Sequence, residues 1–263
     1  MLYLLSPAKR LDYETPVPAA VARRATEPLF TGRAAELIEL MRGKSPAEVA
    51  SLMKLSDPLA LLNVGRYAAW QERADDTNSK PALLAFAGDV YEGLQAGTLK
   101  VGDLDWAQRH LVILSGLYGA LRPLDRLQPY RLEMGTALRN ARGKDLYAFW
   151  GDTLAAYLDE RLLQARGPAV VVNLASNEYS RAALRPSLKA RVIECVFEDW
   201  KDGRYRIISF YAKRARGLMA RWAIEQRVDM PERLPRFEAE GYAFAAADSD
   251  PDRLVFRRRV APD

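Results

Sequence analysis

Residues 114–135, LSGLYGALRPLDRLQPYRLEMG, combine a strongly apolar composition with repeated interruptions of regular structure. The two prolines, Pro123 and Pro129, exclude a long helix, because proline lacks an amide hydrogen and disfavours helical geometry in the residue before it. They also exclude a regular central strand, since they remove donors from the hydrogen-bond ladder. We therefore predict an ordered apolar loop, which either packs as structure alone or presents its arginines at a functional site. These arginines are Arg122, Arg126 and Arg131.

The patterns on both sides of this loop mix short strands with amphipathic helices. Residues 31–42 show helical spacing most clearly, with Ala34, Leu37, Ile38 and Met41 on one face. Strands and helices do not alternate strictly, so we predict one α+β domain over residues 1–263, with a mixed β-sheet and surrounding helices. The other predicted elements are a helix over residues 212–227 and strands over residues 2–5, 83–86, 169–173, 192–198, 205–211, 241–244 and 254–257.

The amino-acid composition limits the classes of protein to which this chain can belong. The chain has 263 residues, of which 49% are apolar, enough for a substantial core. No apolar run approaches the roughly 18 residues that span a bilayer, and the N-terminus MLYLLSPAKR lacks the basic start of a signal peptide. Cys195 is the only cysteine, so the chain cannot form an internal disulfide. We therefore expect a cytoplasmic protein that acts as a monomer and has no membrane partner.

Scarce histidine and cysteine limit the metal chemistry. His110 and Cys195 are the only residues of their types, which excludes zinc and iron sites built from several such ligands. His110 lies in an apolar setting and is predicted to be structural. Cys195 lies in the strand-like run VIECVFE and is predicted to be an inert core thiol. We expect no metal and no cofactor.

The charge is unevenly distributed, although the net value is only +5. Residues 204–227 contain seven basic side chains against Glu225 alone, whereas residues 75–105 contain six acidic side chains against Lys80 and Lys100. Clustered cations often mark an anionic partner, because they attract phosphates and release their counterions. The alternative is a basic solvated face that offsets an acidic one.

Residues 45–70 predict two helices joined by a tight hairpin. The first helix begins at the capping box of Ser45 and Glu48, and the second begins at Ser56 or Asp57. This pattern resembles a helix-hairpin-helix, in which unpaired backbone amides at a helix N-terminus bind a phosphate. Lys54 and Ser56 would add a charge and a hydroxyl, but they replace the usual hairpin glycines. A plain αα-hairpin is therefore the competing interpretation.

Other basic loops suggest a shared groove. Lys213, Arg214 and Arg216 are predicted to lie where a strand passes into a helix, near the positive end of the helix dipole. Cations at that end of a helix are repelled by the dipole. A bound phosphate would offset this repulsion, and acidic neighbours or a later start of the helix would also remove it. Lys9 follows the first strand directly, and Lys144 lies in a loop with further basic residues.

Catalysis is harder to predict. Two acidic groups brought together with Lys9 could perform acid–base chemistry or hold Mg²⁺, but their spacing fixes no such pair. The candidates are Asp89, Tyr91, Glu133, Asp145 and Glu178.

An ordered set of motifs covers essentially the whole chain and resembles the YaaA family of peroxide stress proteins. The matching blocks are residues 6–9 (SPAK), 11–13 (LDY), 86–94 (FAGDVYEGL), 114–135, 143–150 (GKDLYAFW), 173–179 (NLASNEY), 215–219 (ARGLM) and 240–242 (EGY). The resemblance implies a DNA-binding protein with a helix-hairpin-helix that helps to lower free iron, and hence oxidative damage, during peroxide stress.

Together these observations predict a protein that binds duplex or branched DNA through a basic cleft. A small phosphate-bearing ligand is the alternative occupant, and an enzyme acting on a nucleotide or nucleic acid through Lys9, Asp89 and Arg131 is the rival function. An enclosed pocket around these three residues would favour the enzyme, and a long open basic groove would favour the DNA-binding protein. The predicted nucleic-acid contacts are Lys9, Lys54, Ser56, Arg122, Arg131, Lys144, Lys213, Arg214 and Arg216.

Overall fold

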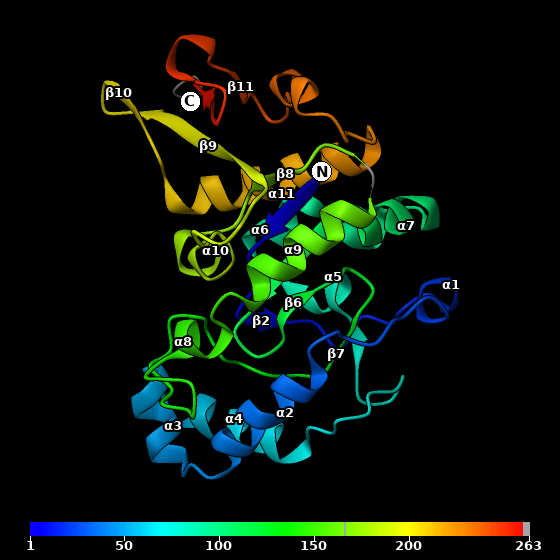
Figure 1. Ribbon diagram of the computed structural model, residues 1–263, viewed down its shortest axis with the longest axis vertical. Helices are drawn as coiled ribbons and strands as arrows, with labels where there is room; N and C mark the ends of the chain where they lie inside the picture. The colour runs from blue at the N-terminus through cyan, green and yellow to red at the C-terminus, as the bar shows by residue number, and fades with distance from the viewer. Residues whose placement is uncertain (166, 260–263) are drawn as a thin grey trace.

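A mixed β-sheet is the framework of the protein. The computed structural model describes residues 1–165 and 167–259. The sheet contains β1 (Leu2–Leu5), β5 (Leu111–Ser115), β6 (Gly119–Leu121), β8 (Val170–Asn173), β9 (Arg191–Lys201), β10 (Arg204–Arg206), β11 (Ala243–Phe244) and β12 (Arg253–Arg258). Their order is β11-β12-β9-β8-β1-β5-β6, with β10 paired to β9 (Figure 1).

The centre of the sheet is parallel and its margins are antiparallel. β1 pairs in parallel with both β5 and β8, and β9 pairs in parallel with β8 and β12. β1, β5 and β8 are completely buried, and apart from Ser115 and Asn173 at the ends of β5 and β8 they are apolar, as expected for strands covered on both faces. The carboxyl ends of these parallel strands therefore meet at one edge of the sheet.

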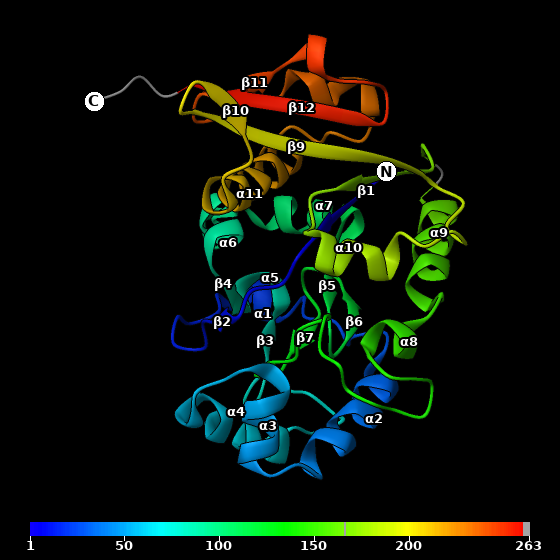
Figure 2. The same cartoon turned by 90° about the vertical axis from the view of Figure 1, so that its left-hand side faces the viewer.

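Helices surround the sheet and extend the molecule at one end. They are α1 (Ala19–Ala22), α2 (Thr31–Arg42), α3 (Pro46–Met53), α4 (Asp57–Ala69), α5 (Ala82–Ala85), α6 (Asp89–Leu94), α7 (Val101–His110), α8 (Leu146–Trp150), α9 (Thr153–Gln164), α10 (Asn177–Ala183) and α11 (Ser209–Glu225), with short 3₁₀ turns at Ala96–Thr98, Pro231–Arg236 and Ala246–Asp248. α2, α3 and α4 lie at the end of the molecule opposite β9 and β12 (Figure 2). Two small ribbons complete the fold: β2 (Arg10–Leu11) with β4 (Phe86–Ala87), and β3 (Lys80–Pro81) with β7 (Arg126–Leu127).

The α+β prediction is confirmed, and one continuous cluster of buried apolar side chains extends from Met1 to Phe256. The predicted helix over residues 31–42 is also correct and buries the four apolar residues named for it. Within the described parts of the chain, no helix is both long and apolar enough to cross a bilayer.

One predicted strand is wrong, and a second is correct at its start but too long. Residues 83–86 mostly form the helical turn α5, because an apolar run this short carries no period that separates strand from helix. The predicted strand 205–211 ends at Arg206, where its pairing with β9 ends, and α11 begins at Ser209. The helix predicted from residue 212 therefore starts three residues earlier and ends at Glu225.

The segment 114–135 begins as the edge hairpin β5–β6 and continues as an apolar loop with the short strand β7. Its prolines lie outside the strands, as predicted. Gly119 has a φ of 68°, and a Cβ there would lie 2.6 Å from the ring of buried Trp150. A Cβ on Gly116 would collide with the backbone carbonyl of Leu132. These glycines let the loop fold back against itself.

α6 and α11 pack with their backbones in direct contact. A Cβ added to Gly217 would overlap the carbonyl oxygen of Val90 and lie 2.9 Å from the amide nitrogen of Leu94. A Cβ on Gly93 would likewise meet the backbone of Arg214. This crossing sets Asp89 at the start of α6 opposite Lys213 of α11.

Candidate functional site

A cleft of about 900 Å³ opens at the carboxyl ends of β1 and β8. Glu194 of β9 pairs with Asn173, the last residue of β8, so the rest of β9 extends past β8 and forms one wall. Ligand sites in sheets with parallel strands commonly lie outside the carboxyl ends of the strands. The lining residues come from segments 6–10, 87–92, 130–133, 176–179, 194–197 and 207–216.

Four of the predicted basic residues line this cleft: Lys9, Arg131, Lys213 and Arg216. Lys9 Nζ lies 3.2 Å and Arg131 Nη2 lies 3.0 Å from the same carboxylate oxygen of Glu133. Lys213 Nζ lies 3.7 Å from Asp89. The three candidate catalytic residues, Lys9, Asp89 and Arg131, therefore line one site, although they come from distant parts of the sequence.

Arg216 has a different environment from the other three cations. It makes no hydrogen bond or ion pair with any residue that the structure describes, and its Nε is buried without a partner. Burial lowers the pKa of this guanidinium, and the nearby charge of Glu194 opposes that shift. Over residues 1–165 and 167–259, the other buried side-chain nitrogen or oxygen atom lacking a partner is Nε of Arg131, in the same cleft. Buried polar groups are normally hydrogen-bonded, so both guanidiniums need further acceptors.

The turn after β1 is fixed to its surroundings. Ser6 Oγ accepts a hydrogen bond of 2.8 Å from the amide of Ser176, which follows β8. The backbone carbonyl of Ser6 accepts a hydrogen bond of 3.0 Å from the hydroxyl of Tyr91. These contacts join neighbouring strand ends and α6. They place Lys9 over the cleft, with Glu133 as its partner.

The opposite wall is the second half of the segment 114–135. The hydroxyl of Tyr130 is 2.6 Å from Ser115 Oγ, and the hydroxyl of Tyr67 in α4 donates to the carbonyl of Arg131. Burial raises the pKa of Tyr130 above its ordinary value. The wall is therefore held by a buried hydrogen bond at Tyr130 and a partly buried one at Arg131.

Two of the candidate acidic residues have structural roles. Glu178 accepts from the amide of Gly135 at 2.9 Å, and Asp145 caps α8 by accepting from the amide of Ala148 at 2.8 Å. The sequence reasoning missed Glu194, which accepts from the side-chain amide of Asn173 at 3.0 Å and is close enough to Arg216 for its charge to act on it. Its signal was a carboxylate between the apolar residues Ile193 and Cys195. Over the described ranges, no group of three or more His, Cys, Asp or Glu side chains could hold a metal ion.

Cys195 lies in the floor of the cleft with its side chain buried. Burial raises the pKa of this thiol, and the charge of Glu194 raises it further. The thiolate is the form that reacts with oxidants, so the environment keeps this cysteine unreactive.

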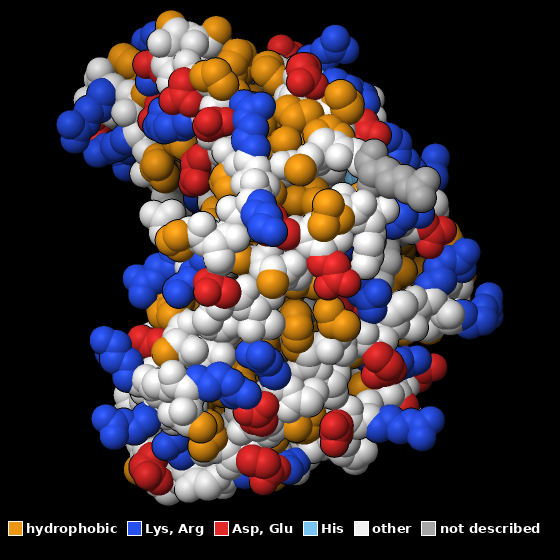
Figure 3. Space-filling model, viewed as in Figure 1, with side chains coloured by type: hydrophobic (Ala, Val, Ile, Leu, Met, Phe, Trp, Pro, Cys, Tyr) orange, Lys and Arg blue, Asp and Glu red, His pale blue; other side chains and the backbone are white. Residues whose placement is uncertain are grey.

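The remaining predicted contacts do not line the cleft, so the expectation of one groove shared by all basic loops is wrong. Arg122 has a structural role, because its guanidinium donates hydrogen bonds from Nε to Asp125 at 3.0 Å and from Nη2 to the carbonyl of Glu27 at 3.0 Å. Lys144 is exposed in the loop before α8, and the α3–α4 hairpin lies at the far end of the molecule. On the face shown in Figure 3, Lys and Arg side chains are mixed with Asp and Glu and do not form a continuous basic surface.

The helix-dipole argument for Lys213, Arg214 and Arg216 is also wrong. Because α11 begins at Ser209, these residues lie in its second and third turns. Acidic neighbours offset two of the charges, since Lys213 pairs with Asp89 and Arg214 makes a bidentate contact with Glu240. Arg216 alone of this cluster has no such partner among the described residues.

The αα-hairpin at residues 45–70 forms as predicted. The capping box joins Ser45 and Glu48, and α4 begins at Asp57 with Pro58 in its first turn. Lys54 adopts the left-handed conformation that a hairpin glycine would take, with φ 54° and ψ 52°. Ser56 makes no side-chain capping bond, and Asp57 adds a negative charge at this helix start. Phosphate binding here stays a prediction.

Comparisons with known proteins identify the family. Residues 1–248 match the family model described as peroxide stress protein YaaA. A UPF0246 protein of Leptothrix cholodnii is 66% identical over 261 residues, covering 99% of this chain and 100% of the relative. UPF0246 proteins of Albidiferax ferrireducens and Bordetella avium are 61% and 58% identical, covering 98% and 99% of this chain and 98% and 100% of those relatives. The chain therefore belongs to the peroxide stress protein YaaA family, which assigns it a general stress-related role.

Proposed function

We propose that this protein is a cytoplasmic peroxide-stress protein that binds DNA, duplex or branched, through phosphate contacts in the cleft. The observation that carries the proposal is Arg216, a guanidinium in the cleft with a buried, unpartnered Nε. Phosphate oxygens are strong acceptors for guanidinium groups. Lys9, Arg131 and Lys213 line the same site and are further cations for the phosphate, although Glu133 and Asp89 offset part of their charge.

The size of the cleft constrains how DNA binds. A volume of about 900 Å³ falls in the range of small-molecule sites, so it accommodates a unit the size of a nucleotide. The α3–α4 hairpin, at the other end of the molecule, would then be a separate contact to the backbone. In this arrangement the cleft engages one phosphate with its nucleotide, and exposed cations outside it contact flanking phosphates.

Salt dependence is the direct test of this binding. Four to six phosphate contacts predict that log K falls with log salt with a slope of about −4 to −5. Titrating a labelled duplex and a branched junction at several salt concentrations measures the slope. Absent binding at low salt, or affinity that does not vary with salt, would refute phosphate-mediated DNA binding.

The hairpin contact has its own test. Lys54→Glu should weaken DNA binding by about 1–3 kcal/mol if a phosphate lies there, because attraction is replaced by repulsion. The fold should survive, since Lys54 is exposed. Lys189→Glu, an equal charge change at an exposed site outside the hairpin and the cleft, is the matched control. Equal affinity of the two variants would make the hairpin a purely structural element.

The proposed route to limiting iron-dependent damage is protection of DNA, and not storage of iron. We therefore expect protein purified without chelators to retain less than one Fe²⁺ or Zn²⁺ per chain after gel filtration, because carboxylate-only sites hold such ions loosely. Elemental analysis of fresh protein measures this. One tightly held iron per chain would contradict the proposed route.

An enzyme acting on a nucleotide or nucleic acid is the second candidate. It is favoured by the convergence of Lys9, Asp89 and Arg131 on one cleft, where Glu133 bridges the two cations. In this case Arg131 and Arg216 would hold the phosphate, and Glu133 would act as a general base that takes a proton from the attacking hydroxyl or water. Mass spectrometry of nucleotides and oligonucleotides after incubation detects any conversion. A turnover that Glu133→Gln abolishes without loss of affinity would support the enzyme.

A further inference from the structure

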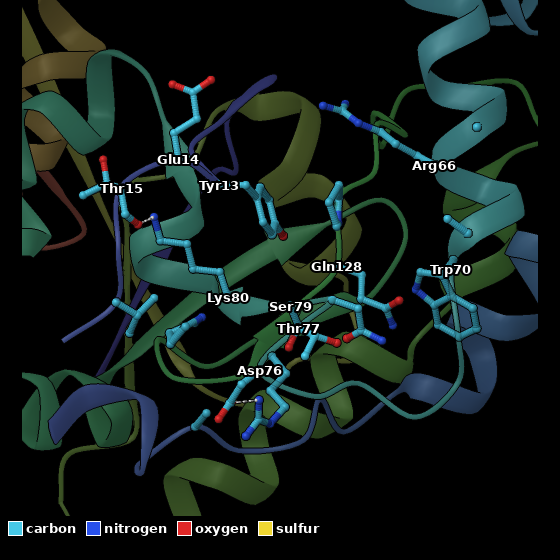
Figure 4. Close-up of a pocket in the computed structure, with 18 of the residues that line it drawn as sticks. Tyr13, Glu14, Thr15, Arg66, Trp70, Asp76, Thr77, Ser79, Lys80 and Gln128 are labelled. Atoms are coloured by element: carbon cyan, nitrogen blue, oxygen red, sulfur yellow. Dashed lines mark hydrogen bonds and ion pairs between the residues drawn. The ribbon is translucent and has the colours of Figure 1, made fainter. Parts of the chain in front are cut away.

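A second pocket, of about 960 Å³, lies between α4 and the loops that contain residues 13–17 and 76–81 (Figure 4). It shares no lining residue with the cleft. Consecutive residues of one segment nevertheless line the two sites. Gln128 and Pro129 line the pocket, and Tyr130 and Arg131 line the cleft. The segment 126–133 is thus a common wall with one site on each side.

The pocket is mainly apolar. Leu61 and Leu62 of α4 are 64% and 48% exposed and border it, next to Trp70, Tyr13 and Pro129. α4 buries its other side through Ala60, Asn63 and Tyr67, so these leucines are not needed for the core. Exposed apolar side chains gathered around a hollow indicate a surface that another molecule covers.

Most polar groups in the pocket already have partners. Lys80 Nζ donates to the carbonyls of Asp12 and Thr15, each at 2.9 Å, and Arg126 pairs with Asp76. Gln128 exchanges hydrogen bonds with the backbone of Gln71. A polyhydroxylated or multiply charged ligand would therefore find few free groups here.

Two charged lining residues are the exceptions: Glu14, which is exposed, and Arg66. The recorded partner of Arg66 is the amide oxygen of Asn63 at 3.3 Å, and no carboxylate among the described residues lies within ion-pair distance. Figure 4 shows its side chain extending from α4 toward Tyr13, across the pocket. Burial lowers the pKa of Arg66, which is the direction expected of a cation without a nearby counter-charge.

We propose that this pocket binds an amphipathic monoanion, an aromatic or aliphatic group bearing one carboxylate or sulfonate. The apolar part packs against Leu61, Leu62 and Trp70, and Arg66 binds the acid group through its fork of N–H donors. A single available cation in an apolar setting selects one negative charge. The proposal is independent of DNA binding in the cleft.

A pair of probes that differ by the acid group tests this assignment. 8-Anilinonaphthalene-1-sulfonate and its uncharged analogue N-phenyl-1-naphthylamine are titrated by fluorescence against the folded full-length chain. We expect the sulfonate to bind at one site per chain and at least tenfold more tightly, as a charged hydrogen bond implies. Arg66→Gln should remove this preference while leaving the affinity for the uncharged probe nearly unchanged.

Leu62→Ser should weaken the binding of both probes, and this result tests the apolar part of the site. Leu163→Ser, at a leucine that is 80% exposed on α9, and Arg204→Gln, at an exposed arginine on β10, are the matched controls and should change neither. Circular dichroism confirms that each variant is folded. Equal affinity of the two probes for the wild type, a preference that survives in Arg66→Gln, or no saturable binding would each overturn the proposal.

Discussion

Replacing Gly217 with alanine should lower the free energy of unfolding by about 3–5 kcal/mol, or prevent folding altogether. The added Cβ would overlap the carbonyl oxygen of Val90 and lie 2.8 Å from its carbonyl carbon. Both atoms belong to the backbone of α6, which cannot move away as the end of a side chain could. Relief requires α6 and α11 to separate, and that would also part Asp89 from Lys213.

Urea denaturation of the purified variant measures this effect. Gly102→Ala is the matched control, because Gly102 lies in α7 and a Cβ there meets nothing within 4 Å. That change should leave stability the same or raise it by up to about 1 kcal/mol, as alanine favours helix. If Gly217→Ala does not fold, thermal aggregation in cell extracts still ranks the two variants. A loss below 1 kcal/mol for Gly217→Ala would refute the tight crossing.

Replacing Arg216 with methionine should have opposite effects on binding and on stability. Affinity for DNA should fall by about 10- to 100-fold, since a charged hydrogen bond to phosphate is lost. The free energy of unfolding should rise by about 1–3 kcal/mol, because a partly buried cation without a carboxylate partner is replaced by an apolar side chain of similar size. If Arg216 instead stabilised the fold, Arg216→Met would lower the free energy of unfolding.

Fluorescence anisotropy and urea denaturation on the same preparations measure the two quantities. Arg214→Met provides the comparison within the same helix, because Arg214 pairs with Glu240 and does not line the cleft. Its affinity should change less and its stability should not rise. Unchanged DNA affinity in Arg216→Met would contradict the phosphate-binding role of Arg216 on which the proposed function rests.

Local patterns in the sequence predicted the elements that neighbouring residues determine. The face of α2 and the capping box of Ser45 and Glu48 follow from spacing over one or two turns. The error at residues 83–86 has the same origin, because four apolar residues fit a helical turn as well as a strand. The start of α11 could not be predicted from local sequence, because it depends on where the pairing between β9 and β10 ends in the sheet.

The candidate site was only partly predictable, because strand order creates it. Lys9 and Arg131 were identifiable as basic residues in unusual loops, but their shared contact with Glu133 requires the fold. Glu194 was missed because its strand reads as core, whereas β9 lines the cleft from the residue that pairs with the end of β8 onward. Gly217 gave no signal in the sequence that α6 would press against it.

The wall formed by residues 126–133 has a thermodynamic consequence. α4 borders the pocket, and its Tyr67 is hydrogen-bonded to the carbonyl of Arg131, whose side chain faces the cleft. Free energy is a function of state, so the order in which the two sites fill cannot matter. Any factor by which an anion in the pocket changes affinity for DNA must equal the factor by which DNA changes affinity for that anion. A displacement of this wall by either ligand would thus make each a regulator of the other.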